Sequence, residues 1–213
     1  MAGAKRPPGR PRLADLSVPT DVSIITAAAN LFMDMGYRAV TMEMVAEAAG
    51  VTKAAVYYHF SDKATLFVAA AHHVFDRARS ATERLLAQPG SLRGRLLEIA
   101  KVVLALPRPF TEFDAMMHEA TLDLSPEQIT DIHAQERSVD EVIEQACFTA
   151  AQRGEIRAPD PMLAAHGFLA LLRVGQARDE EGNPRFPDTL RTADVLIDML
   201  WGGIDVERAA QQR

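Results

Sequence analysis

Residues 41–63, TMEMVAEAAGVTKAAVYYHFSDK, decide the fold of the N-terminal part of this chain. They predict two short helices that begin at Thr41 and Thr52, whose hydroxyls can cap the first turn. Gly50 lies between the helices, where the turn needs a positive φ, and the small Ala46 lets the helices cross closely. This spacing is typical of a helix-turn-helix. The apolar residues expected to hold the pair together are Val45, Ala49, Val51 and Val56.

The second helix of this pair carries a surface that suits DNA. Ala54 and Ala55 keep it slim enough to lie in the major groove. The alternative is a solvated amphipathic helix whose tyrosines pack inward, because one face of the helix must pack on its neighbour. We expect contacts to bases and phosphates from the polar side chains along the helix, which are Thr52, Lys53, Tyr57, Tyr58 and His59.

Further helices are predicted on both sides of this motif. From Thr20, apolar residues recur at helical spacing as far as Gly36, and glycine is a common residue at the end of a helix. Downstream, Ser61 and Asp62 are placed to cap a long helix that runs towards Leu85. Residues 20–70 therefore form a predicted three-helix DNA-binding domain.

The remainder of the chain also has helical periodicity, and no segment alternates as a strand does. The clearest helix start is Ser125, followed by Pro126 at the first helical position and by Gln128, which can complete a capping box. We predict an all-α fold of about nine helices, with a C-terminal helical domain for ligand binding and dimerisation at 71–213. Residues 1–19 are rich in Pro, Gly and Arg, and we predict a flexible basic arm there.

Charge is unevenly distributed along the chain. The formal net charge is −6, but residues 1–72 sum to +1 and residues 73–213 sum to −7. A basic end on an acidic body is typical of a protein that binds a polyanion through one module. In the arm, Arg10 and Arg12 flank Pro11. They suit either a narrow A·T minor groove or non-specific attraction to DNA, and the sequence leaves both open.

Residues 24–70 resemble the N-terminal domain of the TetR/AcrR family of bacterial regulators. Further along, RGEI at 153–156, followed by Asp160-Pro161, is similar to the AefR-like or AcrR-like branch of that family. The positions that carry the N-terminal resemblance are Phe32, Gly36, Tyr37, Thr41, Ala46, residues 49–52 and 56–60, Lys63 and Leu66.

The resemblance implies a function and a set of DNA contacts. It implies a cytoplasmic, homodimeric repressor that binds an inverted repeat in double-stranded DNA. A small molecule, apolar or aromatic, is expected to release the repressor from this operator. In the family, the usual DNA contacts stand at the positions of Thr41, Thr52, Lys53, Tyr57, Tyr58, His59 and Lys63.

The resemblance also implies a dimer interface. In this family, two late helices of each protomer pair with those of a second copy, and the matching segments here are 161–177 and 189–205. An apolar stripe on the last helix has the spacing that such pairing needs, although packing within the chain is the alternative. The stripe comprises Leu190, Ala193, Ile197, Leu200 and Ile204.

A sensor pocket is implied between the middle helices of the chain. Methionine and aromatic side chains make soft walls for an apolar ligand, and a histidine could anchor its polar group. Each of these residues could equally be ordinary core. The candidate ligand contacts are Phe110, Phe113, Met116, Met117, His118, Phe148, His166 and Phe168.

The sequence argues against several other functions. It contains no G-x-S-x-G, phosphate loop, dinucleotide-binding glycines or H-E-x-x-H, so we expect no enzyme and no catalytic residues. His72 with Asp76, and Asp114 with His118, have the spacing of metal ligands, but neither pair has a third ligand nearby, so we expect no metal and no cofactor. Cys147 has no disulfide partner and is expected in the core. No apolar run reaches the roughly 18 residues that a membrane span needs.

Overall fold

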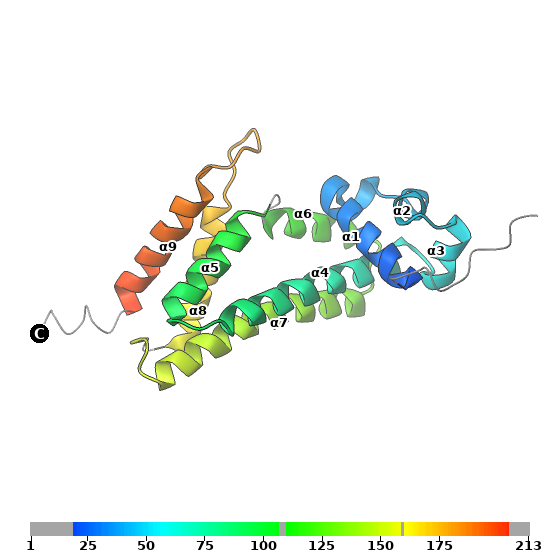
Figure 1. Ribbon diagram of the computed structural model, residues 1–213. Helices are drawn as coiled ribbons and strands as arrows, with labels where there is room; N and C mark the ends of the chain where they lie inside the picture. The colour runs from blue at the N-terminus through cyan, green and yellow to red at the C-terminus, as the bar shows by residue number, and fades with distance from the viewer. Residues whose placement is uncertain (1–18, 107–109, 159, 205–213) are drawn as a thin grey trace, which may run out of the picture.

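The computed structural model describes residues 19–106, 110–158 and 160–204, and in these ranges the chain forms nine α-helices (Figure 1). The predicted all-α fold is confirmed. Arg178 and Pro184 form an isolated antiparallel bridge in the loop before the last helix. The helices are α1 (Thr20–Ala39), α2 (Met42–Ala49), α3 (Lys53–His59), α4 (Lys63–Leu86), α5 (Leu92–Leu104), α6 (Phe110–Ala120), α7 (Pro126–Gln152), α8 (Pro161–Gly175) and α9 (Thr189–Ile204).

Local sequence signals set the helix ends as predicted. The hydroxyls of Thr41 and Thr52 accept hydrogen bonds from backbone N–H groups three positions on, at 3.3 and 3.2 Å. Ser125 and Gln128 form the reciprocal capping box at the start of α7. Gly36 has a φ of 78°, so the regular part of α1 ends there and one further turn follows the kink.

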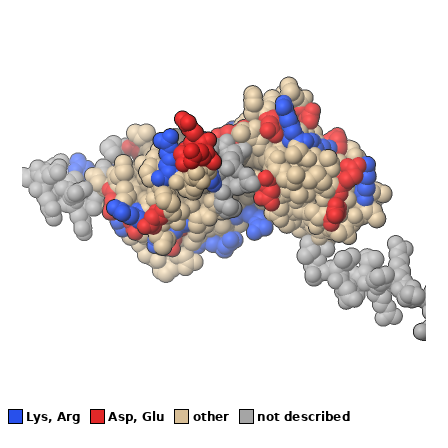
Figure 2. Space-filling model, turned by 90° about the horizontal axis from the view of Figure 1, so that it is seen from above, with Lys and Arg blue, Asp and Glu red and all other residues tan. Residues whose placement is uncertain are grey.

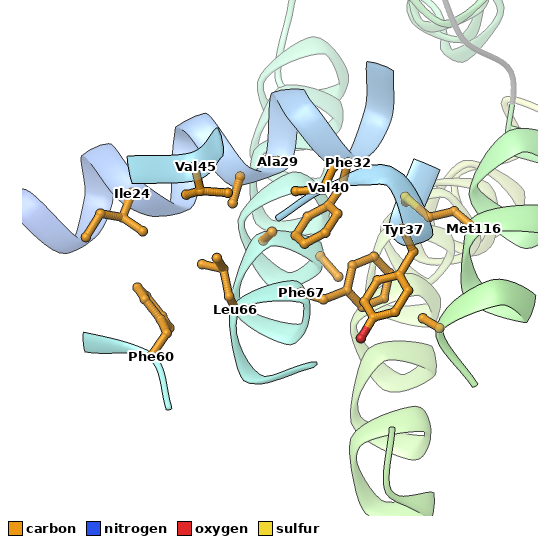
Figure 3. Packing of buried hydrophobic residues seen from close by; sticks show 14 of the residues in the cluster. Ile24, Ala29, Phe32, Tyr37, Val40, Val45, Phe60, Leu66, Phe67 and Met116 are labelled. Atoms are coloured by element: carbon orange, nitrogen blue, oxygen red, sulfur yellow. The ribbon is translucent and has the colours of Figure 1, made fainter. Parts of the chain in front are cut away.

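The first hydrophobic core joins α1–α4 to α6 and to the start of α7. At its centre, Phe32, Tyr37 and Phe67 form a three-ring cluster whose centroids lie 5.0–5.8 Å apart. Met116 approaches this cluster from α6 (Figure 3). The helix-turn-helix region and α6 therefore share one core, and displacement of α6 would disturb α1.

The second hydrophobic core is formed by α5, α7, α8 and α9, at the opposite end of the molecule (Figure 1). The close approach of α8 to α5 and α9 depends on Gly175. A Cβ atom at this position would lie 2.7 Å from Leu104 Cδ2 and 2.8 Å from Leu196 Cδ1. The predicted core position of Cys147 is confirmed, because its side chain is buried in this cluster.

The long helices α4 and α7 lie side by side and connect the two cores (Figure 1). Phe67 and Phe75, near the start of α4, belong to the first core, whereas Leu85 and Leu86 at its end pack against the second. The boundary that we expected between residues 70 and 71 falls inside this continuous helix. α4 thus gives the two cores a shared rigid element.

Candidate nucleic-acid interface

The turn between α2 and α3 is fixed by the backbone. Gly50 adopts the left-handed conformation, with φ 67° and ψ 30°. This lets the N–H of Val51 donate to the carbonyl oxygen of Ala46 at 2.9 Å. Val45 and Val56 are fully buried and clamp the two helices from inside. The pair is therefore a rigid unit with one face of α3 turned towards solvent.

The solvent-facing side of α3 carries the side chains that we expected there. Tyr58 is 85% exposed and Tyr57 is 45% exposed. Lys53 and His59 are also exposed. The alternative of inward-packed tyrosines is not what the fold adopts, because Val56 fills the inward position. The exposed residues of α3 extend from Lys53 to His59, so one face of the helix is available to a groove.

Lys53 is held by a partner on the preceding helix. Its ammonium forms an ion pair with the carboxylate of Glu43 on α2 and lies 5.6 Å from the centre of the Tyr57 ring. Hydrogen bonding to Lys53 lowers the pKa of Glu43, and the same bond raises the pKa of Lys53. Exposed ion pairs of this kind contribute little to stability, so Lys53 can exchange Glu43 for a phosphate at small cost.

Lys63 has an unexpected environment. Its Nζ donates to the carbonyl oxygens of Tyr37 at 3.0 Å, Val40 at 3.1 Å and Arg38 at 3.4 Å. It also lies 4.3 Å from the centre of the Tyr37 ring. The ammonium thus caps the end of α1. Sequence reasoning missed this role because the partners lie more than twenty positions away, and no local pattern indicates them.

The remaining predicted DNA contacts lie at the edges of this surface. Thr41 and Thr52 are exposed, and each hydroxyl accepts a capping hydrogen bond. A hydroxyl that accepts such a bond still has a proton to donate to a phosphate. Arg10 and Arg12 lie outside the described residues. On the face shown in Figure 2, acidic and basic side chains are mixed among uncharged ones, so that face does not present one extended basic patch.

Comparison with known proteins agrees with this geometry. Residues 24–70 match the sequence profile of "Bacterial regulatory proteins, tetR family". The chain is 27% identical to the HTH-type transcriptional activator FasR of Mycolicibacterium smegmatis over 206 residues, which cover 95% of this chain and 91% of that protein. It is 28% identical to the HTH-type transcriptional repressor AcnR of Corynebacterium glutamicum, over 71% of this chain and 77% of AcnR.

A solved structure extends the likeness to the whole fold. A Mesorhizobium loti protein assigned to the TetR family of transcriptional regulators superposes with a TM-score of 0.71 and 27% identity, covering 88% of this chain and 97% of that one. The chain belongs to the TetR/AcrR family of transcriptional regulators. Reduced Escherichia coli NemR, at 16% identity and a TM-score of 0.69, shares the fold. TetR/AcrR proteins are DNA-binding regulators rather than enzymes.

The ligand contacts that we expected from the TetR/AcrR resemblance are not gathered around one cavity. Phe113, Met116 and Met117 of α6 are buried in the first core, and the Phe113 ring lies 4.9 Å from that of Phe75 on α4. Phe168 is buried in the second core. The four residues form two groups, one in each core.

The other expected ligand contacts lie at the surface or outside the description. Phe148 is 48% exposed on α7, and His118 is exposed on α6. His166 is also exposed, and its Nε2 lies 3.0 Å from Oε1 of Glu144. The side chain of Phe110 lies outside the described residues. None of these positions was distinguishable from core by sequence periodicity alone.

An open pocket of about 320 Å³ lies elsewhere, between the C-terminal ends of α4 and α7 and the start of α5. Arg95 spans one side of it, donating to the carbonyl oxygen of Leu86 at 3.0 Å and lying 3.6 Å from Glu155. The sequence analysis did not indicate a pocket at any of these residues. The pocket is lined by Glu83, Leu86, Ala87, Arg95, Val142, Gln145, Ala146, Thr149, Ala150, Arg153 and Glu155.

The two histidine–aspartate pairs do not come together as metal sites. Among the described residues, no three His, Cys, Asp or Glu side chains could hold a metal ion jointly. Instead, Nε2 of His72 lies 2.9 Å from Asp131 on α7, and Asp114 lies 3.7 Å from Arg173 on α8. None of the described helices has the length and apolar content that a membrane crossing requires.

The stripe predicted on the last helix is only partly a free surface. Ala193 and Ile197 are buried within the chain, so their assignment to contacts between protomers is wrong. The intrachain alternative holds for them, because helical spacing identifies an apolar face but not what covers it. Leu190 is exposed, and the side chain of Ile204 lies outside the described residues. Among the described side chains of α8 and α9, the large apolar ones that are exposed are Met162, Leu163, Val174, Leu190, Val195 and Met199.

Proposed function

We propose that this regulator is a homodimeric, ligand-responsive repressor of the TetR type. It binds an inverted-repeat operator in double-stranded DNA, and a small apolar or aromatic molecule releases it. The exposed polar face of α3, with Tyr58 85% exposed, is the observation that carries this proposal. A rigid helix that presents tyrosine, lysine and histidine to solvent matches what a major groove accepts.

We assign the DNA contacts by their position on this surface. Lys53, Tyr57 and Tyr58 face outward along α3 and are proposed to contact bases and nearby phosphates. Thr41, Thr52 and His59 flank them and are proposed to contact phosphates. Arg10 and Arg12 of the arm would add a minor-groove or non-specific contact. A direct phosphate contact by Lys63 would require its ammonium to leave three carbonyl oxygens.

A second copy of the chain is proposed to cover α8 and α9. Both helices expose apolar side chains, including Leu163 of α8 at 70% and Met199 of α9 at 64%. Exposed apolar surface of this extent is typical of an interface. A two-fold axis there would place two α3 helices in successive major grooves, about 34–36 Å apart.

Release is proposed to act through α4. Its last residue, Leu86, and the next residue, Ala87, border the open pocket, and its first residue, Lys63, contacts the end of α1. A ligand that favours a displaced α4 would change the spacing of the recognition helices. Solved proteins of the same fold support an apolar ligand, since SmeT is known with triclosan and Bacillus subtilis FadR with stearoyl-CoA. We also propose a cytoplasmic location, where the DNA is.

Activation of transcription is the second candidate function. FasR, 91% of whose length is matched by this chain, is named as an activator. The surface of α3 serves either role, because the effect on transcription depends on where the operator lies relative to the promoter. Transcription of a reporter from the bound promoter, with and without the protein, distinguishes the two roles.

The DNA-binding assignment is tested with Tyr58→Ala. Footprinting upstream of the protein's own gene, or enrichment from random duplexes, supplies the DNA. The variant is expected to lose about 5- to 150-fold in affinity, since a good base contact contributes about 1–3 kcal/mol. Phe148→Ala is the matched control, because Phe148 is another exposed aromatic residue far from α3. Equal affinities of Tyr58→Ala and the parent protein would refute the assignment.

A further inference from the structure

Lys63 connects the two ends of the helix-turn-helix. The side chain belongs to the first residue of α4, immediately after the segment that contains α2 and α3. Its ammonium contacts the carbonyl oxygen of Val40, the residue directly before Thr41, where that segment begins. The carbonyl oxygens at the end of a helix lack partners within the helix, and the helix dipole favours a cation there. Lys63 therefore holds entry and exit of the motif together.

Tyr37 links the same point to the body of the protein. Its ring is buried between Phe32 and Phe67, under the Lys63 ammonium. Its hydroxyl donates a hydrogen bond to Asp123 Oδ2 at 2.9 Å, and Asp123 lies in the turn between α6 and α7. Figure 3 shows the ring packed beside Phe67, with Met116 nearby. One side chain of α1 thus contacts α4 and the turn after α6.

A second hydrogen bond reinforces this link. The backbone N–H of Arg38 donates to Glu119 Oε2 of α6 at 3.2 Å. The last turn of α1 is therefore bound by an ammonium from α4 on one side and by two carboxylates from the α6 region on the other. A buried phenol that loses its acceptor incurs the full cost of its desolvation. The arrangement consequently favours one position of α1 relative to α6.

We propose that Tyr37, Lys63 and Asp123 form a joint that sets the orientation of the recognition helix relative to the sensory body. This inference rests on the proposed function and deepens it, because it names the contacts through which the body controls α3. Lys63 is then a positioning residue that keeps its carbonyl partners when DNA is bound, rather than a phosphate contact. A shift of α6 or of the turn after it would be passed to Val40 and so to the first residue of α2.

The salt dependence of DNA binding tests the role of Lys63. The slope of log K against log salt is negative, and each phosphate contact that is lost reduces its magnitude by about 0.9. Lys63→Met is expected to weaken binding about tenfold, within the usual range of coupling between sites, and to leave this slope unchanged. Lys53→Gln is the matched control, and the magnitude of its slope is expected to decrease. If the magnitude of the slope decreased by about 0.9 per protomer in Lys63→Met, the positioning role would be overturned.

The link through Asp123 is tested by a milder set of variants that keep the core intact. Tyr37→Phe and Asp123→Ala each remove the hydrogen bond, whereas Asp123→Asn keeps an acceptor oxygen. The first two are expected to weaken DNA binding about tenfold, with no further loss in the double variant. Asp123→Asn is expected to bind within about twofold of the parent protein, a rescue that follows from retaining the acceptor.

A distance measurement separates orientation from stability. Nitroxide labels are attached to Glu47→Cys in a Cys147→Ala background. Pulsed electron paramagnetic resonance then measures the distance between the labels on the two helix-turn-helix units of the dimer. The distance distribution is expected to broaden in Tyr37→Phe and to stay narrow in Asp123→Asn. Unchanged distances and affinities in Tyr37→Phe would overturn the joint. If Tyr58→Ala and Lys53→Gln also bind DNA like the parent, the proposed function itself fails.

Discussion

Two glycines on α8 provide a matched test of how the second core is packed. At Gly175, a new Cβ would lie 2.7 Å from Leu104 Cδ2 and 2.8 Å from Leu196 Cδ1, both in buried side chains. At Gly167, the nearest atom would be Leu200 Cδ1 at an ordinary 3.7 Å. The same substitution to alanine, in the same helix, is therefore expected to have opposite effects on the free energy of unfolding.

The expected magnitudes follow from these distances. Overpacking costs about 1–3 kcal/mol, and alanine in place of glycine in a helix returns about 0.5–1 kcal/mol. The gain is at the low end for Gly175, the last residue of α8, so Gly175→Ala should lower the free energy of unfolding by about 0.5–2.5 kcal/mol. This lowers Tm by about 1–10 °C in a chain of this size. Gly167→Ala should raise the free energy by about 0.5–1 kcal/mol.

Thermal unfolding followed by circular dichroism measures both variants. The protomer concentration is held constant, because the Tm of a dimer depends on it. If Gly175→Ala proves as stable as the parent protein while Gly167→Ala is stabilised, Leu104 and Leu196 can move aside freely. That result would refute the conclusion that Gly175 sets the approach of α8 to α5 and α9.

Two further predictions concern the dimer surface and the buried thiol. Leu163→Glu places a charge on the exposed apolar face of α8 and is expected to give a monomer in analytical ultracentrifugation. Leu122→Glu, at an exposed leucine after α6, is the control and should stay dimeric. A dimeric Leu163→Glu would mean that α8 is not in the interface. Burial raises the pKa of the Cys147 thiol to about 11, from a usual value of 9.0. The unfolded chain releases this proton first, so the contribution to stability is complete below pH 9 and is lost as the pH rises towards 11. At neutral pH, a thiol reagent should modify Cys147 only as fast as the protein opens, and rapid modification of the folded protein would contradict its burial.

The DNA-binding motif was predictable because its signals are local. Thr41 and Thr52 cap helices through groups three positions away, and Gly50 adopts a positive φ because the turn itself needs one. The same holds for the capping box at Ser125. Such interactions are encoded within a few consecutive residues, so the sequence predicted the helix starts, the turn and the exposed face of α3.

Only the tertiary structure showed which groups each apolar or charged side chain contacts. Ile197 was expected on a dimer stripe and Met116 in a ligand pocket, but the packing of distant helices decided that both are covered within the chain. Lys63 was expected to contact DNA, yet three carbonyl oxygens from the end of α1 surround its ammonium. Periodicity shows which face of a helix must be buried, and a charged residue must be either solvated or paired. Which side chain or backbone group covers that face or pairs with that charge depends on contacts between segments far apart in the chain.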